Sequence, residues 1–378
     1  MLKRPLCLLT LATLCLCAAI MPTAPADDNS DPQYFRSFSH WEQWGGSENS
    51  FEMAGNQLSL QRGENEPSAL LTRDDFDNFE VAFDFLLSKW CESGFYIHAP
   101  RNGAFRAGLE IALSSQSGSP DPKYVMGAIS GEMAPLAPVK QEANVWHTFS
   151  ARMEWPRLHV VIDGVVVQDL DLSAHPELRH KLKRGSIGFQ NNGYGASFRN
   201  FRLAPLPDST KEIALFNGEN LNDWTAALGE ARWTVEDGAI VARESDGYLK
   251  HDVTVQDFHL RMYVRASDLA NGGVFFRWVG DADEDRGYEI QILDVPGTDW
   301  PTGSIYSHAR GNDLALAPGQ WQLLQIVAEG GAVRTFVNGV PSASATDLEK
   351  VRPGHIVLQM HRTRAEIAFK GIVLESLD

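Results

Sequence analysis

The most constraining feature of this 378-residue sequence is that its two halves match each other. Landmarks recur in the same order in both halves: Trp44 and Trp224, Gly108-Leu109-Glu110-Ile111 and Gly287-Tyr288-Glu289-Ile290, Asp163-Gly164 and Asn338-Gly339, and Gln190 and Gln359. The offset falls slowly from 180 residues (224 − 44) to 169 (359 − 190). Such an order indicates a duplicated domain with a period too long for a solenoid. We predict domains at residues 34–206 and 213–378, each with its own core.

Both halves have the pattern of β-structure. Short apolar or alternating runs, such as residues 79–85 and 159–167, lie between Gly, Pro, Asn and Asp residues. The Asp163-Gly164 pair favours a two-residue hairpin turn. Many short strands with such turns are typical of a β-sandwich or barrel.

The N-terminus has the layout of a secretory signal peptide. Lys3 and Arg4 precede an apolar run at residues 6–20, and a small-residue cleavage site follows before Asp27. We therefore assign residues 1–26 to a signal peptide and predict a secreted or periplasmic protein. A lipoprotein is the second alternative, because Cys15 and Cys17 close the run but lack a small residue before them.

The net charge and the cysteine content limit the classes of binding partner and the disulfides that the chain can have. Removal of residues 1–26 takes the formal charge from −16 to −18 and leaves Cys91 as the one cysteine, so no intrachain disulfide can form. Such an acidic chain repels phosphate backbones, which argues against nucleic acid as a partner but not against a neutral carbohydrate. No segment after the signal peptide has the length and hydropathy of a membrane span.

One stretch of the second half combines polar and apolar residues in alternation. In residues 287–294, Tyr288, Ile290 and Ile292 take one face of a strand while Glu289 and Gln291 take the other. Asp294 falls on the apolar side unless a β-bulge after Gln291 brings it beside them. The preceding strand, residues 272–278, carries Arg277 as its lone charge. A plain solvated sheet face is the alternative interpretation.

The second half resembles the 3-keto-disaccharide hydrolase domain family over nearly all of residues 213–378, and the first half resembles a diverged member. The motifs that carry the resemblance are residues 215–224, 233–238, 273–277, 287–294, 302–306, 336–339 and 358–361. The resemblance implies two tandem concanavalin-like jelly-roll β-sandwiches, an all-β fold with a ligand groove on the concave sheet. It also implies cleavage of glycosides that are oxidised to a ketone at C3.

That substrate class accounts for a polar strand face. A C3 ketone acidifies the C2 hydrogen, so a base can remove it and expel the aglycone from C1, after which water adds back. Such a site needs a base, an acid or metal for the enolate oxygen, and donors for the sugar hydroxyls. Matched to the family motifs, the expected catalytic residues are Glu289, His361 and Asp294. The expected substrate-binding residues are Arg277, Gln291, Tyr306, Trp300 and Gln359. No metal ligands are assigned, although the chemistry is compatible with a divalent cation.

Departures from the family pattern limit this transfer. Met360 and Arg362 stand where members often have Asp and Gly around the motif histidine. In the first half, Ala112 stands opposite Gln291, Ser115 opposite Asp294, His98 opposite Arg277 and Asn192 opposite His361, and only Glu110 is retained. The first domain is therefore expected to be a binding or packing module.

Several alternatives remain open at this point. The spacing of Glu289, Gln291 and Asp294 also resembles the carboxylate signature of jelly-roll β-glucanases, although a 13 Å Cα separation (about four strand residues) is wide for a retaining pair. His361 could be a structural histidine, and residues 281–285 could be a cation site or a solvated loop. The paired tryptophans Trp44, Trp224, Trp146 and Trp321 are expected in the core, whereas Trp278 and Trp300 are expected to stack on sugar. A non-catalytic carbohydrate-binding protein is the alternative from a different functional class.

Overall fold

The computed structural model describes residues 34–63, 67–116, 119–280, 285–312, 318–361 and 365–377. The signal peptide predicted at residues 1–26 lies outside these ranges. From Pro32 to Asp378 the chain forms one compact unit by its contacts. Among the described residues, no helix has the length and apolar character needed to cross a membrane.

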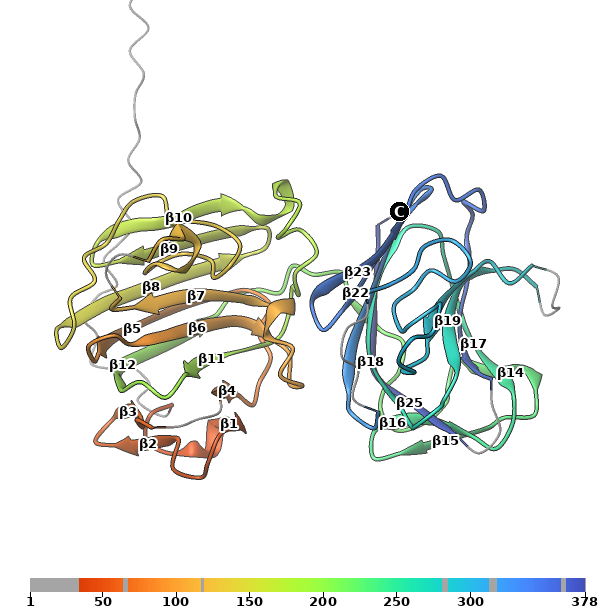
Figure 1. Cartoon of the computed structure of the whole chain (residues 1–378), viewed down its shortest axis with the longest axis horizontal. Coiled ribbons are helices and arrows are strands. Elements are labelled where there is room, and N and C mark those ends of the chain that lie inside the picture. The colour runs from red at the N-terminus through yellow and green to blue at the C-terminus, as the bar shows by residue number, and fades with distance from the viewer. Residues whose placement is uncertain are drawn as a thin grey trace, which may run out of the picture. The chain divides into compact units, whose positions relative to one another are not determined.

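The first copy of the repeat is a sandwich of two antiparallel sheets (Figure 1). The smaller sheet has the order β1 (Trp41–Gly45), β4 (Ser68–Thr72), β11 (Ser186–Asn191), β6 (Glu92–Ala99) and β7 (Leu109–Ser114). The larger sheet has the order β10 (Val165–Asp171), β9 (Arg157–Ile162), β8 (Trp146–Glu154), β5 (Phe79–Leu87), β12 (Ala196–Pro205), β3 (Gln57–Leu60) and β2 (Phe51–Ala54). Four short 3-10 turns accompany them: η1 (Phe38–His40), η2 (Phe105–Ala107), η3 (Pro122–Tyr124) and η4 (Leu172–Ala174).

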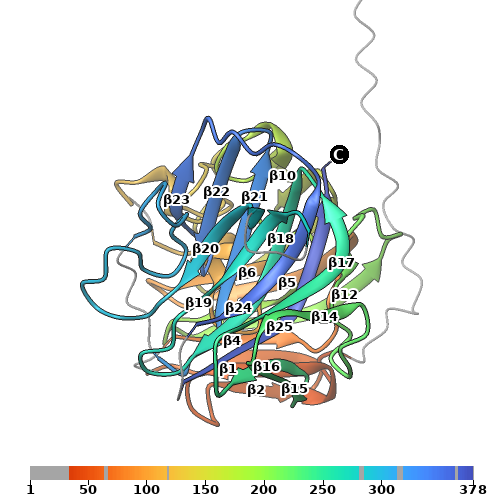
Figure 2. The same ribbon diagram turned by 90° about the vertical axis from the view of Figure 1, so that its right-hand side faces the viewer.

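The second copy repeats this arrangement. Its smaller sheet has the order β14 (Trp224–Gly229), β17 (Gly247–Val255), β24 (Gly354–Met360), β19 (Gly272–Trp278) and β20 (Tyr288–Ile292). The larger sheet has the order β15 (Arg232–Glu236), β16 (Ala239–Arg243), β25 (Glu366–Ser376), β18 (Phe258–Ala266), β21 (Gln322–Glu329), β22 (Ala332–Val337) and β23 (Val340–Ala345), and β13 (Ile213–Ala214) pairs with β25. Figure 2 shows β19, β24 and β17 running side by side. The predicted all-β fold with two tandem jelly-roll sandwiches is therefore confirmed.

Each copy has its own hydrophobic core between its two sheets, because the inner strand faces are apolar. The first core is rich in aromatic side chains, and Phe83 stacks on Phe149 with ring centroids 4.5 Å apart. The two-residue turn predicted at Asp163-Gly164 is confirmed, and its counterpart in the second copy has the same conformation. Asp163 and Gly164, like Asn338 and Gly339, all have positive φ, as a type I′ hairpin requires.

One pairing of landmarks is wrong by three residues. Trp224 is buried and its indole N–H donates to the Leu215 carbonyl at 2.8 Å. The first-copy residue in that position is Trp41, which is 1% exposed and donates to the Tyr34 carbonyl. Trp44 is instead 37% exposed. The prediction that Trp44 belongs to the core is therefore wrong, since two tryptophans stand three residues apart and the pattern did not distinguish them.

A β-bulge in β19 fixes which side chains face which way in the second copy. Phe275 pairs with Val357 of β24 while Trp278 pairs with His355, so one extra residue is accommodated in β19. Arg277 lies in this bulge with a φ of 56°. Two glycines make room for it, because a Cβ on Gly354 would lie 2.5 Å from the Arg277 Cα and a Cβ on Gly287 would lie 2.7 Å from the Arg277 carbonyl carbon.

The bulge removes Arg277 from the outer face of the sheet and buries it completely. Its guanidinium donates to the carbonyls of residues 256, 350 and 330 at 3.0, 3.2 and 2.7 Å, and to Asp257 Oδ1 at 3.1 Å. The same bulge exists in the first copy, where His98 has a φ of 55° and is also fully buried. His98 contacts the Asp77 carbonyl, which corresponds to the residue 256 carbonyl in the repeat. This position therefore anchors the strand in both copies.

We expect Arg277→Ala to destabilise the second copy by about 3–5 kcal/mol, because it removes a fully buried guanidinium that donates to three carbonyls and to the partly buried Asp257 carboxylate. Chemical denaturation of the variant and the wild type measures this difference. Arg232→Ala is the matched control, since the Arg232–Glu244 pair is exposed and contributes about 0–1 kcal/mol. An unchanged denaturation midpoint for Arg277→Ala would show that the buried arginine does not anchor the strand.

Candidate active site

The candidate site lies on the outer face of the smaller sheet of the second copy. Antiparallel register places side chains in cross-strand rows, because directly opposed residues point to the same side. One row contains Gln291, Gly273, Gln359 and Tyr248 on β20, β19, β24 and β17. The next row contains Glu289, Phe275, Val357 and Lys250 on the same strands. The site therefore has an amide-rich row beside a row that carries a carboxyl group and apolar side chains.

Gly273 gives the Glu289 carboxyl group its place on this face. A Cβ on Gly273 would lie 2.6 Å from Glu289 Oε1, so the carboxyl group rests over the glycine. On the other side of Glu289, Phe275 is 4% exposed and belongs to an outer apolar cluster with Tyr248, Trp278 and Val357. A larger residue at position 273 would displace the carboxyl group from the sheet.

Burial shifts the pKa of Glu289 far from its ordinary value. Desolvation raises the pKa of Glu289 from 4.5 to about 7, and the nearby charge of Arg286 opposes that rise. No hydrogen bond to its carboxyl oxygens is present among the residues that the structure describes. A half-buried carboxyl group that ionises near neutral pH and has an open hydrogen-bonding capacity is suited to proton transfer.

Tyr248 lies in the neighbouring row and its hydroxyl group has a defined direction. Gln359 Nε2 donates to the Tyr248 oxygen at 2.9 Å, and Arg286 also donates to it. The Arg286 guanidinium lies 4.6 Å from the centroid of the Tyr248 ring. Since both lone pairs of the phenol oxygen are engaged, its O–H remains as a donor toward the site.

Gln291 and Gln359 are the two buried amides of the face, 4% and 6% exposed. Gln291 Nε2 donates to Asn271 Oδ1 at 2.6 Å, which fixes its amide orientation. The sequence-predicted binding residues Gln291 and Gln359 thus lie on the same face as Glu289.

His361 follows β24 and lies at the far end of this face. Its backbone N–H donates to the Asn271 carbonyl at 2.8 Å, and its ring Nδ1 lies 3.4 Å from Asp246 Oδ2. Both side chains are 55% exposed. From the Glu289 row to the His361 row is about 13 Å along the strands and about 10 Å across two strand spacings. The two residues can contact opposite ends of a ligand but do not act as a directly paired acid and base.

The structure corrects the expected position of Asp294. Strand β20 pairs with β19 in unbroken register from Tyr288 to Ile292 and ends there, so no bulge interrupts the strand and Asp294 lies beyond it. Asp294 accepts a hydrogen bond from Thr302 and another from Gln322 Nε2 at 2.8 Å, at the start of β21 in the opposite sheet. Burial raises its pKa, and these two hydrogen bonds partly offset that rise. Asp294 links the two sheets and does not join Glu289 on the outer face.

Of the other residues predicted to contact sugar, two are buried in the protein and two lie at the edge of the site. Arg277, expected as a sugar donor, is buried in the β19 bulge, and Trp278, expected to stack on sugar, is 0% exposed with its indole N–H on the Gly280 carbonyl. Tyr306 is 45% exposed, and its ring centroid is 5.6 Å from that of the half-buried Trp300. The Tyr306 N–H donates to the Glu289 carbonyl at 2.9 Å, which ties this aromatic pair to the edge of the site.

The first copy retains the carboxyl group, but there other protein side chains surround it. Glu110 rests over Gly94 as Glu289 rests over Gly273, and burial raises its pKa to about 7 as well. Gln190 Nε2, however, lies 3.3 Å from Glu110 Oε2 and donates to the Tyr96 hydroxyl at 2.9 Å. Phe105 stacks on Tyr96 with ring centroids 4.6 Å apart. Protein groups therefore occupy the face that the second copy leaves to a ligand.

No group of three or more His, Cys, Asp or Glu side chains that could hold a metal ion occurs within the described ranges. Most of the acidic run proposed as a cation site, residues 281–284, lies outside them. Asp285 is described and forms ion pairs with Lys350 at 3.1 Å and with Arg352.

Sequence reasoning missed Tyr248 and Arg286. Tyr248 lies in an apolar alternation that is indistinguishable from core packing until the register of β17 with β24 places it opposite Gln359. Arg286 immediately precedes the motif strand, but no periodicity extends to it. The repeat does hold a signal for Tyr248. Gln190 of the first copy pairs with the small residue Ala69, whereas its counterpart Gln359 pairs with Tyr248, so the two copies differ at this position.

Comparison with known proteins gives a family match for both copies. The profile of the 3-keto-alpha-glucoside-1,2-lyase-like domain matches residues 35–204 and 211–375. No curated protein matches the chain. Among solved structures, a candidate glycosyl hydrolase from Parabacteroides distasonis ATCC 8503 is similar at 14% identity and a TM-score of 0.41, covering 46% of this chain and 91% of the other.

Two further solved structures resemble a single copy. A carbohydrate-binding module from Bacillus subtilis is 20% identical with a TM-score of 0.33, covering 42% of this chain and 98% of the other. The Bacillus licheniformis β-glucanase is 13% identical with a TM-score of 0.35, covering 46% of this chain and 100% of the other. At these TM-scores the likenesses carry no argument about activity.

The burial of Glu289 predicts a pH-dependent stability. Its folded-state pKa of about 7 exceeds its ordinary value of 4.5, so the stabilisation is full below pH 4.5 and is lost as pH rises through about 7. Between pH 4.5 and 8, we expect the free energy of unfolding of the wild type to fall by up to about 3 kcal/mol through Glu289, and we expect this fall to be absent in Glu289→Gln. Denaturation at several pH values measures it, with the exposed Glu219→Gln as control. Equal pH slopes for Glu289→Gln and the wild type would contradict the buried, protonated carboxyl group.

Proposed function

Since the chain belongs to the carbohydrate-active 3-keto-alpha-glucoside-1,2-lyase-like domain family, we propose that its second copy cleaves glycosides whose sugar is oxidised to a ketone at C3. The observation that carries this proposal is the Glu289 carboxyl group, which has a pKa of about 7 and no protein hydrogen-bond partner among the described residues. Export from the cytoplasm, predicted from residues 1–26, is part of the same proposal.

Glu289 acts as the base of the first step. The C3 ketone makes the C2–H bond acidic, and the Glu289 carboxylate takes that proton while the C–H electron pair forms an enolate across C2 and C3. A base with a pKa near 7 is half ionised at neutral pH and still strong enough to accept the proton. Phe275, which lies opposite Glu289 on β19, and the apolar cluster to which Phe275 belongs keep the carboxylate poorly solvated, which increases its basicity.

Tyr248 and the two amides stabilise the charge that develops on oxygen. The enolate oxygen carries a negative charge, and a pre-oriented O–H or N–H donor lowers the energy of that state. The Tyr248 O–H is directed into the site because Gln359 and Arg286 occupy its lone pairs. Arg286 adds a positive charge behind the phenol, which strengthens it as a donor.

Collapse of the enolate completes the cleavage. Its electron pair forms the C1=C2 double bond, the C1–O bond to the aglycone breaks, and the aglycone oxygen takes up a proton as the C3 ketone is restored. Water can then add, its oxygen to C1 and its proton to C2, so that the net reaction is hydrolysis. Glu289 relays the protons of both steps: the proton that it took from C2 passes to the aglycone oxygen, and the carboxylate then takes a proton from the attacking water and delivers it to C2.

The wide spacing of the site residues disfavours direct hydrolysis by two carboxylates. A retaining glycosidase needs carboxyl groups roughly 5 Å apart. Asp294 is held by Thr302 and Gln322 toward the opposite sheet, and not beside Glu289. The β-glucanase mechanism therefore remains the weaker alternative, and a purely carbohydrate-binding role is the outcome of the test in which binding occurs without cleavage.

Glu289→Gln tests the assignment of the base. We expect the variant to lower kcat for release of the aglycone from 3-keto-trehalose or a 3-keto-glucoside by about 10²–10⁴-fold, since the amide cannot accept the C2 proton. The wild-type rate is expected to rise with pH and to level off above about 7, because the ionised carboxylate is the active form.

Assays with and without added divalent cations, and with Glu110→Gln as the matched first-copy variant, complete this experiment. Retained activity in Glu289→Gln would move the base elsewhere, and loss in Glu110→Gln alone would place the chemistry in the first copy. Binding of the keto-sugar without release under all conditions would favour the lectin-like function.

Tyr248→Phe tests the oxygen donor separately. We expect kcat to fall by about 10–10²-fold with little change in KM, since the hydroxyl group acts on charge that appears only in the transition state. Tyr194→Phe is the control, because Tyr194 is an exposed residue of the first copy. A change in KM alone would make Tyr248 a ground-state sugar contact.

A further inference from the structure

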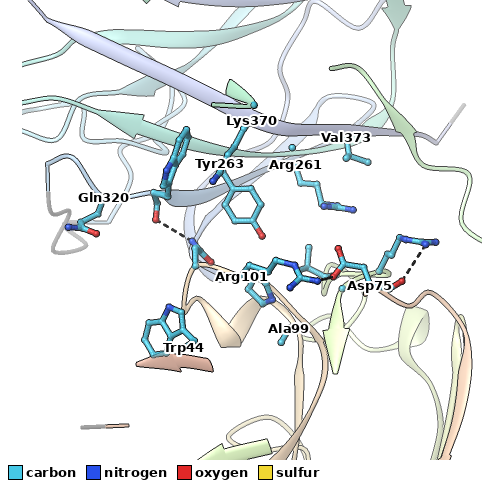
Figure 3. A pocket seen from close by; sticks show the side chains of 17 residues that line it. Trp44, Asp75, Ala99, Arg101, Arg261, Tyr263, Gln320, Lys370 and Val373 are labelled. Carbon is cyan, nitrogen blue, oxygen red and sulfur yellow. Dashed lines mark hydrogen bonds and ion pairs between the residues drawn. The ribbon is translucent and has the colours of Figure 1, made fainter. Parts of the chain in front are cut away.

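One cavity lies away from the Glu289 face, between strands and loops of the two copies within the compact unit. Its volume is about 600 Å³, within the range of small-ligand sites. Its lining includes Trp44, Arg101, Tyr263, Gln320, Trp321 and Lys370. Figure 3 shows Trp44 on one side of this cavity and Tyr263 and Lys370 on the other.

The contacts around the cavity fix its walls. Lys183 Nζ lies 2.6 Å from Glu375 Oε2, in side chains that are 12% and 14% exposed. Asn102 Nδ2 donates to Asn338 Oδ1 at 3.2 Å, and Leu182 packs in a small apolar cluster with Leu323. These contacts join the first and second copies, and two of their residues, Asn102 and Leu182, line the cavity.

Trp44 is an exposed tryptophan that is nevertheless held in one orientation. Phe105 packs edge-on against it with ring centroids 5.0 Å apart. The indole lies directly over Gly103, where a Cβ would approach Trp44 to 2.0 Å. With 37% of its surface exposed, Trp44 presents a fixed aromatic surface to the cavity. Such surfaces bind flat apolar faces, including the C–H face of a sugar ring, at little cost in conformational entropy.

Lys370 supplies a positive charge without a carboxylate partner. Its ammonium group lies 4.3 Å from the centroid of the Trp321 ring, and no ion pair joins it to a carboxylate in the described part of the chain. Burial lowers the pKa of Lys370, and the neighbouring Arg265 lowers it further. A partly desolvated cation of this kind is stabilised by an anion that enters the cavity.

The arginines of the cavity do not share this demand for an anion. Arg101 lies 2.9 Å from Asp75, which also accepts from Ser186 at 3.0 Å. Arg184 lies 2.6 Å from Asp208, and Arg261 lies 2.7 Å from Glu212. Lys370 is therefore the cation that selects the charge of a ligand.

We propose that this cavity binds a carboxylate-bearing saccharide, such as a uronic-acid disaccharide. The carboxylate pairs with Lys370 and a sugar ring packs on Trp44. The Gln320 amide is available to sugar hydroxyls, and the Tyr263 hydroxyl, which bonds the backbone of Arg101, can still accept from one. The site is independent of Glu289 and would serve to hold an acidic glycan on the protein. It gives the first copy a role in binding, because that copy contributes Trp44.

Calorimetric titration with a glucuronic-acid-containing disaccharide tests the proposal, beside a neutral disaccharide of the same linkage. We expect binding of the acidic sugar to weaken by about tenfold, or about 1.4 kcal/mol, in both Lys370→Met and Trp44→Ala. Lys89→Met is the matched control, because Lys89 lies over Trp90 in a similar lysine–tryptophan pair outside the cavity. Glu289→Gln is expected to bind the acidic sugar as the wild type does.

Four outcomes would overturn the proposal. Equal affinity for the acidic and neutral sugars would remove Lys370 as the selecting group. Equal affinity for acetate and the acidic disaccharide would reduce the site to a simple anion site. Unchanged binding in both Lys370→Met and Trp44→Ala would place the ligand elsewhere, and loss of binding in Glu289→Gln would place it on the face of the proposed catalytic site.

Discussion

The arrangement of the second copy depends on one inserted residue in β19. The bulge at Arg277 reverses the alternation of the strand, so that Arg277 enters the protein while Trp278 joins the outer apolar cluster. Donation from a single guanidinium to three carbonyls and a carboxylate holds the bulge in place. Glycines at 287 and 354 give it room, and glycines at 108 and 185 do the same for His98 in the first copy. The recurrence of these glycines in the sequence therefore has a steric cause.

The two copies use the same carboxyl position differently. In each, a glutamate rests over a glycine of the adjacent strand, and burial brings its pKa to about 7. In the first copy, Gln190 and the stacked Tyr96 and Phe105 fill the space around it. In the second copy, the corresponding face carries Tyr248 and Arg286, and the Glu289 carboxylate beside them has no hydrogen-bond partner among the described residues. Duplication has kept the buried acid, while the side chains around it decide whether a ligand can reach it.

Much of this could be predicted from the sequence, and the failures share one origin. The repeat, the strands, the hairpin turn and the placement of Glu289 and Gln291 on one face follow from local sequence patterns, whereas Gln359 was assigned from the family resemblance. Arg277 and Asp294 were misplaced because a bulge has no reliable pattern: it was expected in β20 and occurs in β19. Trp44 was misplaced because Trp41 stands close to it. Tyr248 was missed because its role depends on pairing with a strand more than a hundred residues away.

The bulge also limits what sequence alignment can transfer between proteins of this fold. An alignment preserves the order of residues along the chain, but the side of the sheet that a residue occupies depends on how many residues separate it from the last regular pair. Deleting or adding one residue before Trp278 would exchange inward and outward positions for the rest of the strand without changing the motif letters. A binding residue that is assigned from a relative across such a point can therefore face the opposite side of the sheet. The positive φ at position 277 marks the point in this chain where the alternation changes.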